Sequence, residues 1–179
     1  MTSKQELAEK YAVELAALAR ETVDANHFFV LGTSHPDGQP RVSPVYFNHH
    51  EYRAFYWVSS PDSQHSRNLA ADPRVNAVVF DSSVDPGPQT AAVYLTGAAV
   101  EVPQGDLESE IPRAFDRSLG TARSFTVDEL SGTGVLRLYR LDVTTAEVHA
   151  RGGHPLWGLG VDTRLPVTIP KRRREAGGR

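Results

Sequence analysis

Three short segments decide how this chain folds: RVSPVYF (41–47), FYWVS (55–59) and SQHSRNL (63–69). The first two are rich in β-branched and aromatic residues, which is typical of strands. The third has a serine ahead of a short helix-compatible run, which is typical of a helix start. The N–H groups of a helix's first turn lack internal partners and stabilise an anion, and His65 and Arg67 can add charge-assisted bonds. The pattern therefore predicts a phosphate site at this helix start.

The first of these segments is expected to be a strand with one free side. Its even-numbered side chains face one way and its odd-numbered side chains face the other. Pro44 has no N–H to donate to a neighbouring strand, so one side of the strand is expected to lack a partner there. Arg41 and Ser43 can project toward the helix start, and the backbone around Pro44 can meet the edge of a flat ring. The simpler alternative is that Arg41 is solvated and Ser43 is incidental.

The remaining elements extend the sheet on both sides of these segments. A capping box at Ser3 and a helical spacing of apolar residues predict an amphipathic helix over residues 3–24. A hairpin loop is expected at residues 48–53 and a helix at 105–119. Further strands are expected at residues 27–33, 75–80, 92–102 and 135–148, with Gly97 permitting a bend. About six strands without β-α-β alternation favour an antiparallel barrel.

Length, charge and composition limit the possible classes of protein. The chain has 179 residues, and we expect a single domain over residues 1–170 followed by a basic, disordered tail at 171–179. The tail carries five cations and one anion, so the rest of the chain has a net charge of −7, which argues against nucleic-acid binding. No cysteine, long apolar run or secretory signal is present. We therefore expect a cytoplasmic protein without thiol catalysis or membrane contact.

The side chains do not by themselves reveal a reaction. Trp57 is expected in the core, whereas Trp157 lies in a glycine-rich segment and is the better candidate for a cofactor or dimer contact. The histidines have no further ligands at metal-binding spacing, so no metal site is expected. No catalytic residue can be assigned, because no nucleophile elbow, Gly-Lys phosphate loop or carboxylate pair can be recognised. A bound cofactor is expected to supply the chemistry.

The order of these segments resembles the pyridoxamine 5′-phosphate oxidase-like superfamily of flavin-binding split barrels. The resemblance runs from about residue 28 to residue 102, and its clearest element is SQHSRNL followed by DPRV (72–75). It implies a mainly β fold with peripheral helices, a six-stranded antiparallel split β-barrel. The residues that it places at FMN are Arg41, Val42, Ser43 and Pro44 along the flavin, Ser59 and Ser60 close by, and Ser63, His65 and Arg67 at the phosphate.

The chain also departs from the vitamin oxidases of this superfamily. They carry lysine where this chain has Tyr46 and His65, and they close with an Arg-Leu-His-Asp-Arg segment where this chain has RLPV (164–167). Vitamin B6 is therefore not the expected substrate. Related branches use a deazaflavin coenzyme or handle haem breakdown products, and many members are homodimers with the flavin between subunits.

The leading hypothesis is a homodimeric, FMN-binding oxidoreductase that acts on an unidentified small molecule. Two alternatives stay open. One is a reductase that uses a deazaflavin coenzyme, whose longer anionic tail would recruit more cations. The other is a flavin-binding or ligand-sensing module that performs no turnover.

Overall fold

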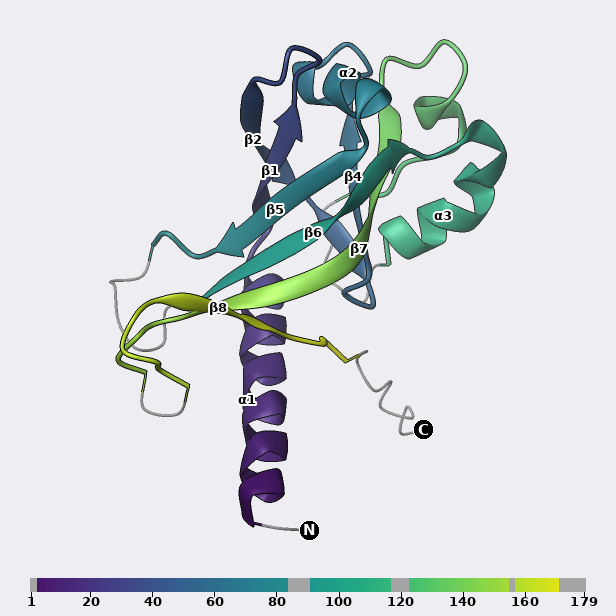
Figure 1. Cartoon of the computed structure of the whole chain (residues 1–179). Helices are drawn as coiled ribbons and strands as arrows, with labels where there is room; N and C mark the ends of the chain where they lie inside the picture. Colours follow the sequence, from purple (N-terminus) through teal and green to yellow (C-terminus); the bar gives the residue numbers. More distant parts are fainter. Residues whose placement is uncertain (1–2, 84–90, 117–122, 155–156, 171–179) are drawn as a thin grey trace, which may run out of the picture.

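The computed structural model describes residues 3–83, 91–116, 123–154 and 157–170. Within these residues the chain forms strands that curl around one core, with helices at the periphery (Figure 1). In chain order the elements are α1 (Ser3–Ala25), β1 (Phe28–Ser34), β2 (Pro40–Tyr46), β3 (Asn48–His50), β4 (Ala54–Ser59), α2 (Gln64–Ala71), β5 (Arg74–Phe80), β6 (Ala92–Glu101), the 3-10 turn η1 (Gln104–Asp106), α3 (Leu107–Ala114), the 3-10 turn η3 (Asp128–Leu130), β7 (Arg137–Ala150) and β8 (Thr163–Pro166).

The strands form one antiparallel sheet whose two ends are neighbours in the sequence. The strand order is β2-β1-β5-β6-β7-β4-β3, and β8 pairs with the end of β7. β2 and β3, which stand at opposite ends of this order, are separated by Phe47 alone. β2 pairs with β1, and β3 pairs with β4. The sheet therefore curls into a split barrel (Figure 1).

The expected class is confirmed, but the described residues contain eight strands and not six. One additional strand, β3, lies in the segment 48–53 that was expected to be a loop. His49 is buried there and stacks on Tyr52 with ring centroids 4.4 Å apart, so tertiary packing turns a polar segment into a strand. The other additional strand is the short β8. The expected bend at Gly97 is confirmed by a register shift, and a Cβ there would lie only 2.0 Å from the carbonyl oxygen of Asp142.

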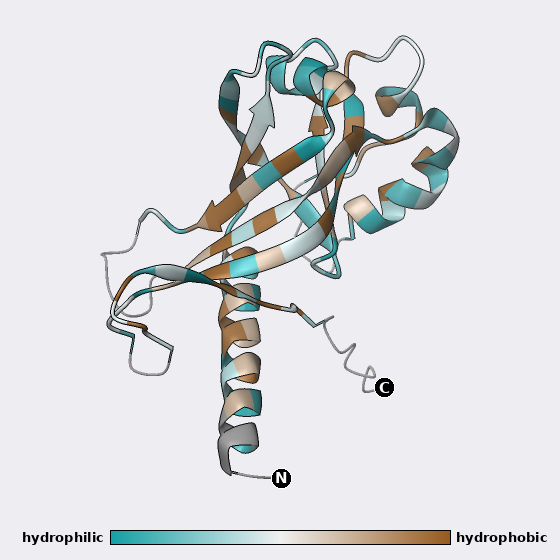
Figure 2. Cartoon of the chain, viewed as in Figure 1, coloured by the Kyte–Doolittle hydropathy of each residue, from teal (hydrophilic) through white to brown (hydrophobic). Residues whose placement is uncertain are grey.

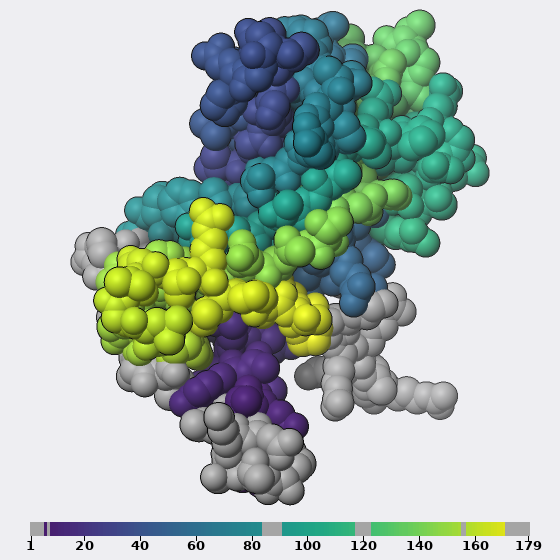
Figure 3. All heavy atoms as spheres, viewed as in Figure 1, coloured from purple at the N-terminus to yellow at the C-terminus, as the bar shows by residue number. Residues whose placement is uncertain are grey.

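The inward faces of the strands make the main core, and their apolar residues alternate with polar ones along the ribbon (Figure 2). Trp57 belongs to this core, as expected. α1 adds the stripe Leu15, Ala19 and Val23. Ile169, which follows β8, joins the same cluster, and Figure 3 shows this C-terminal segment lying over the upper part of α1. α1 ends at Ala25, one residue beyond the expected helix, and no helix among the described residues could span a membrane.

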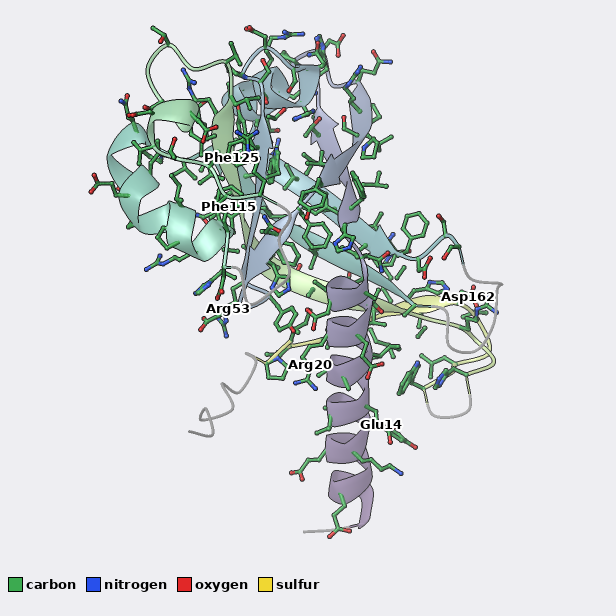
Figure 4. All side chains as sticks on the ribbon, turned by 180° about the vertical axis from the view of Figure 1, so that it is seen from behind. Glu14, Arg20, Arg53, Phe115, Phe125 and Asp162 are labelled. Carbon is green, nitrogen blue, oxygen red and sulfur yellow. The ribbon has the colours of Figure 1, made fainter. Side chains whose placement is uncertain are left out.

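A second, smaller apolar cluster lies under α3 and joins it to β4 and β7. Phe115 and Phe125 pack against each other there, with ring centroids 5.4 Å apart and the ring planes tilted by 42° (Figure 4). α3 ends at Ala114, so the helix expected over 105–119 is shorter, although its last residues fall partly outside the described ranges. The basic tail at 171–179 lies outside the described residues as well.

Candidate functional site

The start of α2 is built by a local hydrogen-bond pattern that the sequence encodes directly. Ser63 is the N-cap in an extended conformation, and its Oγ accepts from the backbone N–H of Ser66 at 3.3 Å. The backbone N–H of Ser63 donates to the carbonyl oxygen of Ser60 at 3.1 Å. This cap fixes the first turn of α2 directly after β4. The helix therefore presents its positively polarised N-terminus at one end of the barrel (Figure 1).

Three of the expected site residues, Ser59, Ser63 and His65, form one hydrogen-bond network with Ser66 at this helix start. Ser59 Oγ lies 2.9 Å from Nε2 of His65 and 3.2 Å from Oγ of Ser63. Ser63 Oγ in turn lies 2.9 Å from Oγ of Ser66. Burial lowers the pKa of His65 below its ordinary value of 6.5, and the charge of Arg41 lowers it further. At neutral pH His65 is therefore an uncharged member of the network.

A polar cavity of about 260 Å³ adjoins the first turn of α2. Arg41, on β2, provides the cation, and Gln64, the first residue of α2, provides an amide. The lining residues are His35, Gln39, Pro40, Arg41 and Gln64. A guanidinium, amide groups and a helix N-terminus around one hollow are suited to an anion.

Arg67 lies apart from this cavity. Its guanidinium donates to the carbonyl oxygen of Asp62 and, at 2.9 Å, to Oε1 of Gln64. Arg67 and Ser66 line a different cavity, of about 380 Å³, together with Tyr139 and Glu101. The structure thus brings Arg41 to one hollow beside α2 and Arg67 to another.

β2 supplies the other expected residues. It stands at the end of the strand order, so its outer edge has no strand partner among the described residues, as Pro44 had indicated. Val42 and Pro44 are exposed, Ser43 is half-buried, and Ser60 sits in the turn before α2, where its Oγ accepts from the backbone N–H of Asp62. None of these four residues is among those that line the polar cavity.

Trp157 is placed differently from the other candidates. It stacks on His154 with centroids 3.9 Å apart and packs partly buried against the main core. It belongs to the β7–β8 loop, which Figure 4 marks by Asp162, and this loop lies at the opposite end of the barrel from α2 (Figure 1). Within one chain, Trp157 is not brought together with the α2 residues. Its expected contact with a cofactor or a partner stays a prediction.

Sequence reasoning missed four of the five residues that line the polar cavity: His35, Gln39, Pro40 and Gln64. The signal for the first two was the turn at residues 36–38, which returns the chain so that the backbone N–H of His35 donates to the carbonyl oxygen of Gln39 at 2.9 Å. Gln64 stood within the quoted helix motif. Among the described residues, no group of three or more His, Cys, Asp or Glu side chains could hold a metal ion.

Comparisons with known proteins give a matching family and similar folds. The family model described as pyridoxamine 5′-phosphate oxidase matches residues 15–149, and no curated protein sequence matches the chain. A solved protein of unknown function from Agrobacterium tumefaciens has a TM-score of 0.60 at 18% identity, over 75% of this chain and 56% of that chain. A heme binding protein from Mycobacterium smegmatis has a TM-score of 0.60 at 20% identity, over 85% and 57%. An FAD-binding protein from Mesorhizobium loti has a TM-score of 0.56 at 20% identity, over 74% and 92%. This chain therefore spans a little over half the length of the first two. At these identities the likenesses show the fold.

Proposed function

This chain belongs to the pyridoxamine 5′-phosphate oxidase family, and we propose that it is an FMN-binding, homodimeric oxidoreductase whose substrate is a small molecule other than vitamin B6. The observation that carries the proposal is the polar cavity at the N-terminus of α2, with Arg41 beside it. The fold accommodates flavins, since the Mesorhizobium loti neighbour is an FAD-binding protein. Tyr46 and the RLPV segment (164–167) replace the lysine and the closing segment of the vitamin oxidases.

The cavity fits the phosphate end of FMN and not its ring. Its volume of about 260 Å³ holds a phosphate and part of a polyol chain, and its lining is polar. A flat ring would then lie outside the cavity, past the free edge of β2, against the exposed side chains of Val42 and Pro44, which face the opposite side of the strand from Arg41. One wall of such a ring site is present in a single chain. The other wall has to come from another surface.

The outer face of β2, β1 and β5 is the surface on which we place a second copy of the chain. Phe28 and Tyr46 are register partners, as are Val30 and Pro44. Because side chains alternate along strands, the even-numbered residues of these strands share one face. Its large exposed members are Phe28 at 58%, Val42 at 71%, Tyr46 at 37% and Phe80 at 42% relative exposure. A contiguous apolar face next to an incomplete ligand site is typical of an interface, and a two-fold dimer would pair it with itself.

The same face also carries a hollow that suits the missing ring wall. This cavity has a volume of about 390 Å³ and mainly apolar walls. Its lining residues are Val78, Phe80, Ala91, Ala92, Tyr94, His149 and Arg151. In a two-fold dimer, the phosphate end of one copy and this hollow of the partner can share one cofactor, which is how the proposal accounts for the lack of a complete site in one chain.

The flavin and the residues of the chain have separate roles in the proposed site. When bound, the flavin ring supplies hydride or electron transfer. Arg41 and Gln64 hold the phosphate, and the α2 N-terminus adds its partial charge. The apolar face excludes water from the ring, which strengthens the remaining polar contacts. The proposed cofactor site is therefore complete only in the dimer.

Spectroscopy of the purified protein tests the proposal. We expect bound or added flavin to give absorption near 450 nm that bleaches when a nicotinamide nucleotide or another donor is added, and mass analysis of the released ligand to identify FMN. A dimer is expected by analytical ultracentrifugation, and Val42→Glu is expected to give a monomer that has lost flavin. Flavin bound without reduction by any donor would favour the non-catalytic module. A protein that binds no flavin would contradict the proposal.

The deazaflavin coenzyme is a second candidate, favoured by the charge of the cavity. Arg41 is the arginine among the lining residues and supplies their permanent positive charge. His35 is paired with Asp37 at 2.8 Å, so that carboxylate offsets any charge on it. His65 lies beside the cavity and is uncharged, because burial lowers its pKa. FMN carries a phosphate monoester with nearly two negative charges at neutral pH, whereas the deazaflavin phosphate is a diester with one. One cation matches the diester, and the further cations expected for the coenzyme's longer anionic tail would have to lie outside this cavity. Parallel titrations with FMN and the deazaflavin coenzyme decide between them.

A further inference from the structure

A fully buried amide connects α2 to the strand beside Arg41. Asn68 has no exposed surface, and its Nδ2 donates to Oγ1 of Thr33 at 3.0 Å. Its Oδ1 accepts from Nε2 of Gln64 at 2.9 Å. A buried amide is costly unless both of its ends are hydrogen-bonded, and here both are. Asn68 therefore holds the first turn of α2 at a fixed distance from β1.

Arg67 fixes the direction of this chain of hydrogen bonds. A guanidinium can only donate, so the Gln64 atom that faces Arg67 at 2.9 Å must be the oxygen. The amide nitrogen of Gln64 then faces Asn68, which must present its oxygen. Asn68 is left to donate its N–H to Thr33. The order Arg67, Gln64, Asn68, Thr33 has one self-consistent polarity, so neither amide can flip without placing two donors against each other.

This chain of hydrogen bonds meets the polar cavity at Gln64 and reaches the strand next to Arg41 at Thr33. Gln64 lines the cavity, and its NH₂ group has a second hydrogen beyond the one donated to Asn68. Thr33 is the register partner of Arg41 across the β1–β2 ladder. A single set of hydrogen bonds thus ties the amide donor on α2 to the strand pair that carries the cation. A rigid spacing between two donors favours a ligand oxygen that bridges them.

We propose that Asn68 and Thr33 are positioning residues that orient Gln64 so that its free N–H and the Arg41 guanidinium hold the same anionic group. The inference deepens the proposed function and rests on it for the identity of the ligand as a cofactor phosphate. It gives Arg67 a role different from direct phosphate contact. Arg67 anchors the polarity of the hydrogen-bond chain by donating to Oε1 of Gln64.

Variants of Thr33 test the inference because they leave the cavity lining intact. Thr33→Val keeps the side-chain shape and removes the oxygen that accepts from Asn68, so we expect roughly tenfold weaker binding of FMN. Riboflavin, which has no phosphate, is expected to bind Thr33→Val as it binds the wild type. Thr33→Ser restores the oxygen and the affinity. Thr22→Val, which removes a hydroxyl bonded to the Leu18 carbonyl in α1, is the matched control and is expected to change neither affinity.

A double-variant cycle separates positioning from general damage to the fold. In a Gln64→Met background, Thr33→Val is expected to cause no further loss of FMN affinity, since the group that it positions is gone. Equal losses of affinity for FMN and for riboflavin in Thr33→Val would overturn the inference. Additive losses of FMN affinity in the double variant would overturn it as well.

Inorganic phosphate provides a readout that does not depend on a flavin. We expect phosphate to shift the side-chain amide NMR signal of Gln64, identified by its loss in Gln64→Met, and to do so more weakly in Thr33→Val. If this holds while neither FMN nor the deazaflavin coenzyme binds, the proposed cofactor is wrong and the positioning role stands. If flavin binds the wild type and Thr33→Val equally, the positioning role is wrong and the cofactor stands. A wild type that binds neither phosphate nor flavin overturns both.

Discussion

α2 and α3 are both eight-residue helices that pack on the barrel over buried polar groups, yet the two networks are completed differently. Under α3, the carboxylate of Glu110 accepts from the Tyr56 hydroxyl at 2.6 Å and pairs with Arg113 at 3.0 Å and Arg140 at 3.3 Å. Its charge is compensated within the chain. At α2, the network consists of neutral hydroxyls, amides and an uncharged His65, beside the charge of Arg41 and the helix N-terminus.

The difference separates a polar network that stabilises the fold from one that is prepared for a ligand. Removing a member of the α3 network leaves buried groups uncompensated, so the cost appears in the free energy of unfolding. Removing Arg41 from the α2 cavity leaves no buried partner behind, so the cost appears in binding. Variants in the two regions should therefore differ in whether they change the free energy of unfolding or the affinity for FMN.

The largest effect is expected for Glu110→Ala. This change leaves the buried Tyr56 hydroxyl without its acceptor and removes one of the two carboxylates that pair with Arg140, the other being Asp142. It is expected to lower the free energy of unfolding by about 3 kcal/mol. Urea denaturation measures it, with Glu14→Ala as the control, because Glu14 forms a surface ion pair with Lys10 at 3.7 Å. FMN affinity should stay the same when folded protein is compared. A loss of stability no larger than that of the control would mean that the α3 network is not structural.

Arg41→Ala is expected to have the opposite result, a loss of FMN affinity with little change in stability. Losing a charge-assisted bond to phosphate should weaken FMN binding by about 30-fold, while the free energy of unfolding changes by less than about 0.5 kcal/mol. Riboflavin affinity should not change. Arg53→Ala, on the β3–β4 turn (Figure 4), removes the same charge elsewhere and is expected to leave FMN binding intact. An Arg41 variant that unfolds easily but binds FMN normally would remove the distinction between the two regions.

A smaller effect is expected on acidification. Burial alone would raise the pKa of Glu110, but hydrogen bonds from Tyr56 and Arg140 and the charges of Arg140 and Arg113 outweigh it, so the pKa lies below its ordinary value of 4.5. A lowered carboxyl pKa stabilises the fold above the unfolded value and loses that contribution as the pH falls through the folded value. Below about pH 4.5 the wild type should therefore lose on the order of 1 kcal/mol more stability than Glu110→Gln. Parallel acid denaturation curves would contradict this sign.

Much of the fold could be predicted from the sequence because local patterns encode it. The β-branched and aromatic residues of β2 and β4 and the capping serine of α2 are local signals, and these elements lie where they were expected. β3 could not be predicted, since its sequence Asn-His-His is polar and becomes a strand through pairing with β4 and packing of His49 on Tyr52. β8 has four residues and depends on the end of β7.

The candidate site likewise contains features that the local sequence predicts and features that depend on distant residues. The cluster of Ser59, Ser63 and His65 follows from a local motif, and the structure brings these residues together. The direction of Arg67 could not be read from the sequence, because it depends on acceptors at Asp62 and Gln64. Gln39 reaches the cavity through a turn far from α2 in the sequence. The contribution of a second subunit, including that of Trp157, depends on contacts that no single-chain pattern contains.

Isothermal titration of the wild-type protein with FMN and with riboflavin tests the central claim most directly, because the two ligands differ only in the phosphate. The α2 cavity is prepared for an anion, so FMN is expected to bind at least about 30-fold more tightly than riboflavin. Equal affinities for the two ligands would contradict the account.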